Sequence, residues 1–158
     1  MSQTKNSSTQ VPGVSDLEKT LLRQRQAFLS EGPPSVKERE ERLDQLMLLM
    51  LENADAFADA MNLDFGCRAP LQSLATDVFG VLPSIKHTRK KFRHWMKPQK
   101  VSGGLVGMSG GKAWIQWQPL GVVGIVSPWN FPLALALQPL AEALAAGNRA
   151  MIKVSEFA

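Results

Sequence analysis

The sequence predicts an α/β fold, in which N-terminal helices and a β-hairpin arm precede a strand–helix–strand unit with two parallel strands. Val122–Val126 is a β-branched run typical of a strand buried on both faces, and Ala150–Val154 is a second apolar run. Between them, Leu133–Ala146 is apolar nearly all round and predicts a buried helix, although Pro139 lies inside it. A strand, a helix and a strand of these lengths form a βαβ unit with a right-handed crossover.

The composition is that of one folded domain. The chain has 158 residues, of which 44% are hydrophobic, and this is enough to bury a core. The net charge is +4, but residues 78–141 contain no Asp or Glu. A basic surface of this kind can bind nucleic acid or another anionic partner, or it can simply be exposed to water. The single cysteine, Cys67, excludes an internal disulfide bond and predicts a reducing, cytoplasmic location.

The first residues are expected to be disordered. Residues 1–13 are polar and lack the apolar core of a signal peptide, so we predict a flexible tail there. Elsewhere, Pro, Asn and Gln interrupt the apolar stretches, and none of these stretches reaches the length of a membrane span. The folded part of the chain is therefore expected at residues 14–158.

Residues 14–97 are predicted to form three helical parts. Ser15–Glu18 and Ser35–Glu38 each place a Ser three residues before a Glu, which is the pattern of a capping box at a helix start. Gly32–Pro34 ends the first helix. The second helix is expected to be long and to end between residues 62 and 66, because one apolar stripe runs along it. The stripe consists of Leu43, Met47, Met50, Ala54, Phe57 and Met61.

The third helical part runs from Leu71 to Met96 and is expected to bend at Gly80 and Pro83. A β-hairpin arm is then predicted at residues 101–118. Its turn is expected at residues 109–112, where Ser, Gly, Gly and Lys have the composition of a turn, and the next residues alternate weakly in polarity. The arm carries tryptophans, Trp114 and Trp117, which suit either a subunit interface or the core.

Polar side chains follow the carboxyl ends of both predicted strands. Asn130 comes shortly after the first strand, and Lys153 and Glu156 lie at the end of the second. Ligands of open α/β sheets bind beyond the carboxyl ends of the strands, so these residues are candidates for one binding site. From the residues alone, an alternative is equally open: Asn130 caps the following helix, and Glu156 is simply solvated.

Several motifs occur in a fixed order in the second half of the chain: Gln118–Ile125 (QPLGVVGI), Pro128–Pro132 (PWNFP), Ala145–Asn148 (AAGN) and Lys153–Glu156 (KVSE). Their order and spacing resemble the aldehyde dehydrogenase superfamily. Further upstream, three segments resemble its coniferyl-aldehyde and fatty-aldehyde branch: Leu63–Gly66, Lys86–Lys90 and Trp95–Pro98. The resemblance runs from about Val14 to the end of the chain.

The resemblance implies the first part of a larger enzyme. Family members are much longer, and their general-base glutamate, nucleophilic cysteine and catalytic domain have no counterpart in this sequence. Cys67 lies in the loop after the second helix, far from the family's nucleophile motif, and is expected to be an ordinary thiol. We therefore expect an N-terminal fragment or truncated product. It would be the start of a parallel-sheet NAD-binding domain, an incomplete aldehyde dehydrogenase fold that is inactive by itself.

The resemblance also implies a chemistry for the strand ends. In the family, a thiolate attacks the aldehyde carbon, hydride passes to the nicotinamide, and water releases the acid. Asn130 is implied to donate its amide to the oxyanion, while Lys153 and Glu156 are implied to bind the adenosine ribose. A carboxylate at Glu156 favours NAD over NADP, although NADP stays open, and no GxGxxG motif follows the first strand. The remaining implied cofactor-binding residues are Val126, Ser127, Pro128, Trp129 and Ser155.

Partners are implied by the resemblance as well. They are a small-molecule aldehyde, for which coniferyl aldehyde is a candidate, and a second copy of the enzyme joined through the arm as a dimer. No metal site is expected, because His87 and His94 have no Cys or carboxylate nearby in the sequence.

Two other functions compete with the enzyme hypothesis. The chain could be a non-enzymatic truncated product or an oligomerisation module, in which case it should expose apolar surface. Nucleic-acid binding by the basic residues 86–100 ranks well below this, since Phe92 and Trp95 have a spacing that suits packing better than base stacking.

Overall fold

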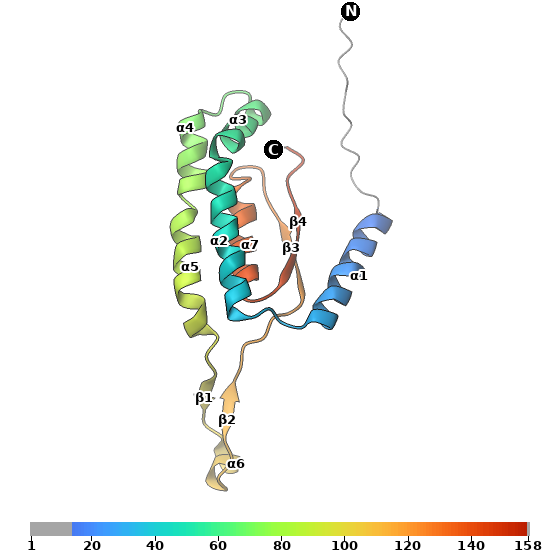
Figure 1. Ribbon diagram of the computed structural model, residues 1–158, viewed down its shortest axis with the longest axis vertical. Coiled ribbons are helices and arrows are strands. Elements are labelled where there is room, and N and C mark those ends of the chain that lie inside the picture. Colours follow the sequence, from blue (N-terminus) through green and yellow to red (C-terminus); the bar gives the residue numbers. More distant parts are fainter. Residues whose placement is uncertain (1–13, 158) are drawn as a thin grey trace, which may run out of the picture.

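A small parallel sheet lies between helices. The computed structural model describes residues 14–157, so the predicted tail at residues 1–13 lies outside the described residues. Strands β3 and β4 have α1 on one face and α7 on the other, and α2 and α5 pack against α7 in turn (Figure 1). The arm extends away from this body. The predicted α/β class is confirmed.

The N-terminal half is helical, as predicted. Its elements are α1 (Val14–Glu31), α2 (Val36–Glu52), α3 (Ala54–Phe65), α4 (Pro70–Ser73), the π-helix η1 (Leu74–Phe79) and α5 (Leu82–Trp95). Because α1 already includes Val14, Ser15 lies inside its first turn rather than before it. Gly32, with φ of +72°, follows the end of α1. The capping box before α2 is confirmed: the Ser35 hydroxyl accepts from the Glu38 N–H, and the Ser35 N–H donates to the Glu38 carboxylate.

The predicted long second helix is wrong, because α2 and α3 are separate helices on either side of Asn53. The Asn53 side chain donates to the Leu49 carbonyl at 2.8 Å, and the Asn53 N–H donates to the same oxygen at 3.2 Å. Such a side-chain bond to the backbone competes with continuation of the helix. The apolar stripe nevertheless crosses the break, since Leu43, Met50 and Met61 are all buried.

The third helical part is interrupted at Gly80, as predicted. Helix α4 runs directly into η1, and α5 begins after a turn at Gly80. A Cβ atom on Gly80 would lie 2.7 Å from the Thr76 carbonyl oxygen, so this turn favours glycine. Pro83 does not bend the helix, because it lies in the first turn of α5, where proline is tolerated.

The arm is a β-hairpin with a short helix at its tip. β1 (Gln99–Val101) pairs with β2 (Ala113–Ile115) in antiparallel orientation, and α6 (Gly104–Met108) lies between them. The predicted hairpin is confirmed, but its strands begin and end a few residues earlier than expected. The helix at the tip was also not expected from the composition of the turn.

Apolar side chains of the arm face solvent. Trp114 is 57% exposed and Trp117 is 64% exposed, and Leu105 and Met108 at the tip are each 85% exposed. The alternative in which the two tryptophans pack in the core is therefore wrong for this chain. The arm presents a surface that a partner molecule can cover.

The βαβ unit is confirmed. It consists of β3 (Val122–Val126), α7 (Ala134–Ala145) and β4 (Arg149–Lys153). The strands are parallel, and their last residues, Val126 and Lys153, are register partners. The carboxyl ends of both strands therefore lie at one edge of the sheet.

The strands are less buried than predicted. Ile125 is 6% exposed, but Val126 is 80% exposed and Ile152 is 39% exposed. The reason is that only two strands pair here, so neighbouring strands do not cover these positions within the described chain. The predicted buried helix is closer to the observation, because α7 buries a set of small residues: Ala134, Ala136, Ala141, Ala143 and Ala145.

The core lies where α2, α5 and α7 meet. Its largest fully buried apolar side chains are Phe92, Leu43, Met50, Ile85 and Val78. Burial of such side chains is the main favourable contribution to folding. In the described part of the chain, no helix is both long enough and apolar enough to cross a membrane.

The basic face of α5 is partly neutralised by α2. Arg89 forms an ion pair with Asp44 at 2.5 Å, and Arg93 forms one with Glu40 at 2.5 Å. Each guanidinium contacts both oxygens of its carboxylate, which holds the pKa of Asp44 and of Glu40 below the ordinary range. Phe92 on the same helix is buried in the core.

Candidate functional site

The predicted site residues lie at the carboxyl edge of the sheet. Val126 and Lys153 end their strands side by side, Asn130 follows the first strand, and Glu156 follows the second. The parallel pairing alone produces this arrangement, because both chains leave the sheet in the same direction. Asn130 and Glu156 therefore share one edge of the sheet.

Ser127 shapes the loop between β3 and α7. It is 3% exposed, and its N–H donates to the Lys153 carbonyl at 2.9 Å, which extends the ladder between the strands. Its hydroxyl donates to the Pro132 carbonyl at 2.9 Å and so ties the two ends of the loop together. Between these ends, Pro128 and Trp129 are exposed at the edge. Of the predicted cofactor-binding residues, Ser127 thus stabilises the loop through its hydrogen bonds, while Pro128 and Trp129 are exposed to solvent.

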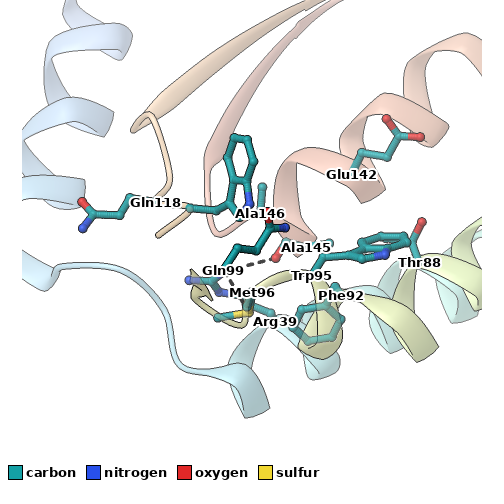
Figure 2. A pocket seen from close by; sticks show the side chains of 11 residues that line it. Arg39, Thr88, Phe92, Trp95, Met96, Gln99, Gln118, Glu142, Ala145 and Ala146 are labelled. Atoms are coloured by element: carbon teal, nitrogen blue, oxygen red, sulfur yellow. Dashed lines mark hydrogen bonds between the residues drawn. The ribbon is translucent and has the colours of Figure 1, made fainter. Parts of the chain in front are cut away.

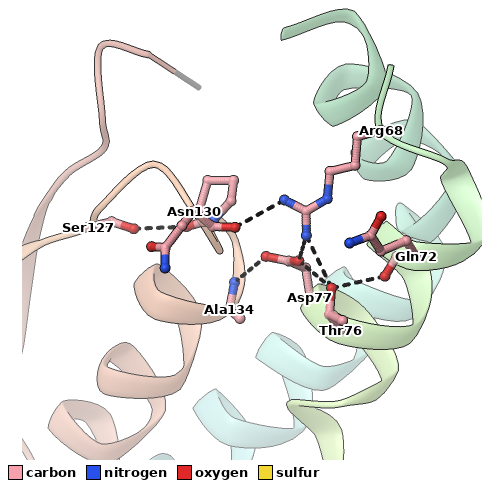
Figure 3. Close-up of polar contacts among 8 residues, drawn as sticks. Arg68, Gln72, Thr76, Asp77, Ser127, Asn130 and Ala134 are labelled. Carbon is pink, nitrogen blue, oxygen red and sulfur yellow. Dashed lines mark hydrogen bonds and ion pairs between the residues drawn. The ribbon is translucent and has the colours of Figure 1, made fainter. Parts of the chain in front are cut away.

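Asn130 does not cap the following helix. The N-cap position of α7 is Leu133, and no side chain of its own segment caps the helix. The Asn130 backbone carbonyl accepts a hydrogen bond from Arg68 Nη1 at 3.2 Å, and its side-chain amide points away from Arg68 (Figure 3). Within residues 14–157, no group bonds to this side-chain amide. The amide is therefore available to a ligand, and the capping alternative is wrong.

Asp77 takes the place of a local cap. Its Oδ1 atom accepts from the Ala134 N–H at 3.2 Å, and its Oδ2 atom pairs with Arg68 Nη2 at 2.5 Å (Figure 3). A carboxylate at a helix N-terminus is favoured by the free N–H groups and by the helix dipole. Neither Arg68 nor Asp77 was among the site residues predicted from the sequence. The available signal was an acidic residue inside the apolar segment LATDVF, which requires a partner if it is buried.

Lys153 and Glu156 form an exposed ion pair with each other. The hydrogen bond from the Lys153 ammonium is the main cause that lowers the pKa of the Glu156 carboxyl below its ordinary value. The Ser155 hydroxyl accepts from the Phe157 N–H at 3.1 Å and so stabilises the turn after β4. The predicted pair is thus brought together as a donor and an acceptor at the sheet edge, with both charges accessible.

These residues offer both polar and apolar contacts to a ligand at the sheet edge. The Glu156 carboxylate can accept hydrogen bonds from two neighbouring hydroxyl groups, and the Lys153 ammonium can donate to the same region. At the same edge, Val126 is 80% exposed and Trp129 is 57% exposed, so their apolar surfaces can pack against an aromatic ring of a ligand. The edge therefore combines exposed apolar surface with charged groups that can bind hydroxyl groups.

A separate cavity lies at the other end of α7, where the arm leaves the body (Figure 2). It has a volume of about 570 Å³ and is lined by Arg39, Thr88, Phe92, Trp95, Met96, Gln99, Trp117, Gln118, Glu142, Ala145 and Ala146. Arg39 is 5% exposed and donates to the Pro34 carbonyl at 3.0 Å and to the Ala145 carbonyl at 3.2 Å. Burial lowers the pKa of its guanidinium. None of the predicted site residues lines this cavity, and Arg39 caps the carboxyl end of α7.

Comparison with known proteins shows that the chain is similar to one family. A model described as the aldehyde dehydrogenase family matches residues 3–158. A probable coniferyl aldehyde dehydrogenase of Caulobacter vibrioides is 48% identical over 139 residues, which are 87% of this chain and 29% of the relative. A coniferyl aldehyde dehydrogenase of a Pseudomonas species is 44% identical over 145 residues, 92% of this chain and 30% of the relative.

Solved structures agree with the sequence relatives. The substrate-bound state of Staphylococcus aureus AldH superimposes with a TM-score of 0.80 at 30% identity, and it covers 89% of this chain and 30% of that protein. An aldehyde dehydrogenase of Brucella melitensis gives a TM-score of 0.78 at 23% identity, which shows the fold. The chain spans about 30% of the length of the relatives it matches.

Proposed function

Because the chain belongs to the aldehyde dehydrogenase family, we propose that it is the nucleotide-binding part of an NAD(P)-dependent enzyme that oxidises an aldehyde to its acid. One observation carries the proposal. The free amide of Asn130 and the Lys153–Glu156 ion pair lie at the same edge of a parallel sheet, beyond the strand ends. This is where open α/β sheets bind their ligands.

Asn130 is proposed to donate its side-chain amide to the carbonyl oxygen of the aldehyde. Attack on the carbonyl carbon places negative charge on that oxygen, and a fixed donor stabilises the charge as it develops. An uncharged amide does this without transferring a proton. The support in this chain is that the Asn130 backbone is fixed while its amide makes no bond within residues 14–157.

The cofactor is proposed to lie across the sheet edge. Lys153 and Glu156 would bind the adenosine ribose, with Ser155 and the loop from Val126 to Trp129 beside it. When bound, the nicotinamide supplies the acceptor for the hydride. The Glu156 carboxylate would repel a 2′-phosphate, so NAD is the favoured cofactor. A cytoplasmic location is also part of the proposal, because the single cysteine, Cys67, cannot form a disulfide bond within the chain.

The proposed substrate is an aromatic aldehyde of the coniferyl type. The support is the identity of 48% and 44% with relatives that carry this name. The test uses a complete enzyme, made by joining this chain to the part of the Pseudomonas relative that it does not match. Formation of NADH from coniferyl aldehyde, faster than from an aliphatic aldehyde, is expected. A completed and folded enzyme that forms no NADH from either aldehyde would contradict the proposal.

In the completed enzyme, Asn130→Ala is expected to lower kcat by ~10²–10³-fold, which is the usual effect of removing one oxyanion donor. KM should change little, because the contact strengthens only in the transition state. The control is Gln45→Ala, which removes an exposed amide from α2 and should leave kcat unchanged. The chain by itself is expected to form no NADH. An equal kcat in Asn130→Ala and the parent enzyme would exclude the donor role.

A second candidate function, self-association through the arm, is favoured by the exposure of Trp114 and Trp117. Aromatic side chains are enriched in protein interfaces, and the arm extends beyond the body. Sedimentation velocity should show a dimer for the parent chain and a monomer for the double variant Trp114→Ser and Trp117→Ser. The control is Leu29→Ser on α1, where Leu29 is 79% exposed. If all three sediment as monomers, the arm does not join copies of this chain.

A further inference from the structure

The segment that carries Asn130 is fixed from the helical layer at two points. Arg68, in the loop between α3 and α4, donates from Nη1 to the Asn130 carbonyl at 3.2 Å. Asp77, on η1, accepts the Ala134 N–H at 3.2 Å. Figure 3 shows both contacts reaching across from the same side of the loop. The two bonds enclose the four peptide units between Asn130 and Ala134, so the start and the end of this turn are both set by distant residues.

Arg68 and Asp77 form one buried, hydrogen-bonded ion pair. Arg68 Nη2 lies 2.5 Å from Asp77 Oδ2, and the two side chains are 9% and 0% exposed. Thr76 Oγ1 lies 2.7 Å from the same carboxylate oxygen and 3.1 Å from Arg68 Nη2. Because the guanidinium is planar and its donors have fixed directions, the Nη2 contact determines where Nη1 points. The position of Asp77 on η1 therefore determines where Arg68 Nη1 meets the Asn130 carbonyl.

Aromatic rings add a second constraint. The Arg68 guanidinium carbon lies 5.3 Å from the centre of the Phe65 ring and 5.8 Å from the centre of the Phe131 ring. Both distances fall within the range of cation–π contacts. Phe131 is the next residue after Asn130, so the arginine contacts the loop through a hydrogen bond and a ring.

Stability alone explains this ion pair poorly. Removing two charges from water offsets most of their attraction, and buried pairs can often be replaced by apolar side chains at no cost. What an apolar pair cannot supply is a donor for the Asn130 carbonyl and an acceptor for the Ala134 N–H. Both contacts act on the loop at the sheet edge.

We propose that Arg68 and Asp77 are positioning residues, which fix the direction of the Asn130 side-chain amide by clamping the backbone on either side of the turn. The clamp holds the backbone carbonyl, so the side-chain amide stays free to face a ligand. The inference rests on the proposed donor role of Asn130 for its catalytic consequence. The clamping itself is a property of this chain and can be measured without activity.

The first experiment uses the chain itself. Arg68→Lys keeps a positive charge beside Asp77 but replaces two nitrogen donors by one, so it should spare most of the fold while losing the bond to Asn130. In NMR spectra, the Asn130 side-chain amide signals should shift and broaden relative to the parent. The Ala134 amide should exchange with solvent about tenfold faster in Asp77→Asn.

The matched control for this experiment is Arg89→Lys, which weakens a surface ion pair with Asp44. It should leave the Asn130 signals unchanged. The clamp is excluded if the Asn130 signals are the same in the parent chain and in both clamp variants while the spectra show folded proteins.

The second experiment uses the completed enzyme and separates positioning from general stability. Arg68→Lys should lower kcat by about tenfold to hundredfold with little change in KM, since a small displacement of a reacting group has effects of this size. In an Asn130→Ala background, the same substitution should lower kcat no further, because Arg68 acts through the Asn130 amide. Equal fold losses in both backgrounds would overturn the inference.

The two proposals fail differently. If Asn130→Ala leaves kcat unchanged, the donor role is wrong, and the NMR result still decides whether the clamp exists. If Asn130→Ala lowers kcat but Arg68→Lys changes neither kcat nor the Asn130 signals, the donor role stands and the clamp is wrong.

Discussion

A single buried carboxylate, Asp77, determines how α7 begins. The segment before this helix supplies no capping side chain, and the residue at its N-cap position is Leu133. Asp77 supplies the acceptor instead, from 57 residues earlier in the chain. Since a free N–H at a buried helix end costs stability, the helix start and the position of η1 are coupled.

Gly147 is a second position at which a single residue is expected to affect the stability of the fold. Its φ is +89°, and a Cβ atom there would lie 2.6 Å from the Arg39 guanidinium carbon. Gly147→Ala should therefore lower the free energy of unfolding by about 1–3 kcal/mol, through backbone strain and through displacement of Arg39. Urea denaturation measures the change.

Gly124→Ala is the matched control for this prediction. Gly124 lies in β3 without a positive φ, and a Cβ atom there meets no atom within 4 Å. This variant should be neutral or slightly stabilising. A similar loss in both variants would show that the crowding at Gly147 has no special effect.

Glu156 gives a prediction about pH. The hydrogen bond from Lys153 lowers the pKa of the Glu156 carboxyl below its ordinary value, so the ion pair contributes at pH values above the ordinary pKa and is lost as the pH falls through the lower folded value. Carboxyl carbon shifts in an NMR titration should show a midpoint below that of an unpaired Glu, and Lys153→Met should move it upward. An unchanged midpoint in Lys153→Met would show that the pair does not form in solution.

At the scale of elements, helices α2 and α7 are capped at their N-termini in different ways. The cap of α2 is local, since Ser35 and Glu38 bond to each other's backbone. The cap of α7 is tertiary. The break between α2 and α3 also has a local cause, because the Asn53 side chain bonds to the carbonyl of the preceding turn. The sequence did not reveal this break, because the apolar stripe that continues across Asn53 favours a single helix.

Ser35→Ala tests the local cap. Loss of the acceptor for the N–H at the third position of α2 should lower the free energy of unfolding by about 1 kcal/mol. The control is Ser30→Ala in the last turn of α1, where the exposed hydroxyl bonds only to the Ala27 carbonyl and the change should be within about 0.5 kcal/mol. Thermal melting followed by circular dichroism measures both. A melting temperature unaffected by Ser35→Ala would show that the capping box does not stabilise this helix.

At the scale of the whole molecule, exposed apolar side chains lie at the carboxyl edge of the sheet and in the segments that follow its strands. Val126, Trp129, Val154 and Phe157 are 80%, 57%, 56% and 72% exposed. Exposed apolar groups in this number are typical of a surface that binds a partner or a further part of a protein. The relatives are about three times longer than the matched region, so they contain chain that is available to cover this surface.

Association with the part of a relative that this chain does not match can be measured directly. The chain should bind a hydrophobic fluorescent dye, and the signal should fall when the remaining part of the Pseudomonas relative is added as a separate protein. Val126→Lys should weaken this association by about tenfold or more, because a charge would be buried at the interface. Leu29→Lys on α1 is the control and should leave it unchanged. Equal association of both variants would place the interface elsewhere.

Much of the fold follows from local patterns. A helix start is specified by Ser35–Glu38, and a helix end by Gly32. The two strands are specified by the apolar runs around β3 and β4. The arm could be predicted as a hairpin but not its helical tip, since small residues with little side chain allow several backbone paths. For the candidate site, strand order alone placed Asn130 and Glu156 at one edge.

The sequence by itself determined the α/β order, the parallel pairing and the edge at which the polar groups lie, because these depend on neighbours along the chain. Only the tertiary structure decided that Asn130 leaves its amide free, that Asp77 caps α7, and that Arg68 reaches the loop across 62 residues. The physical reason is that a buried polar group takes whichever partner packing brings within about 3 Å, and that partner has no fixed distance in sequence.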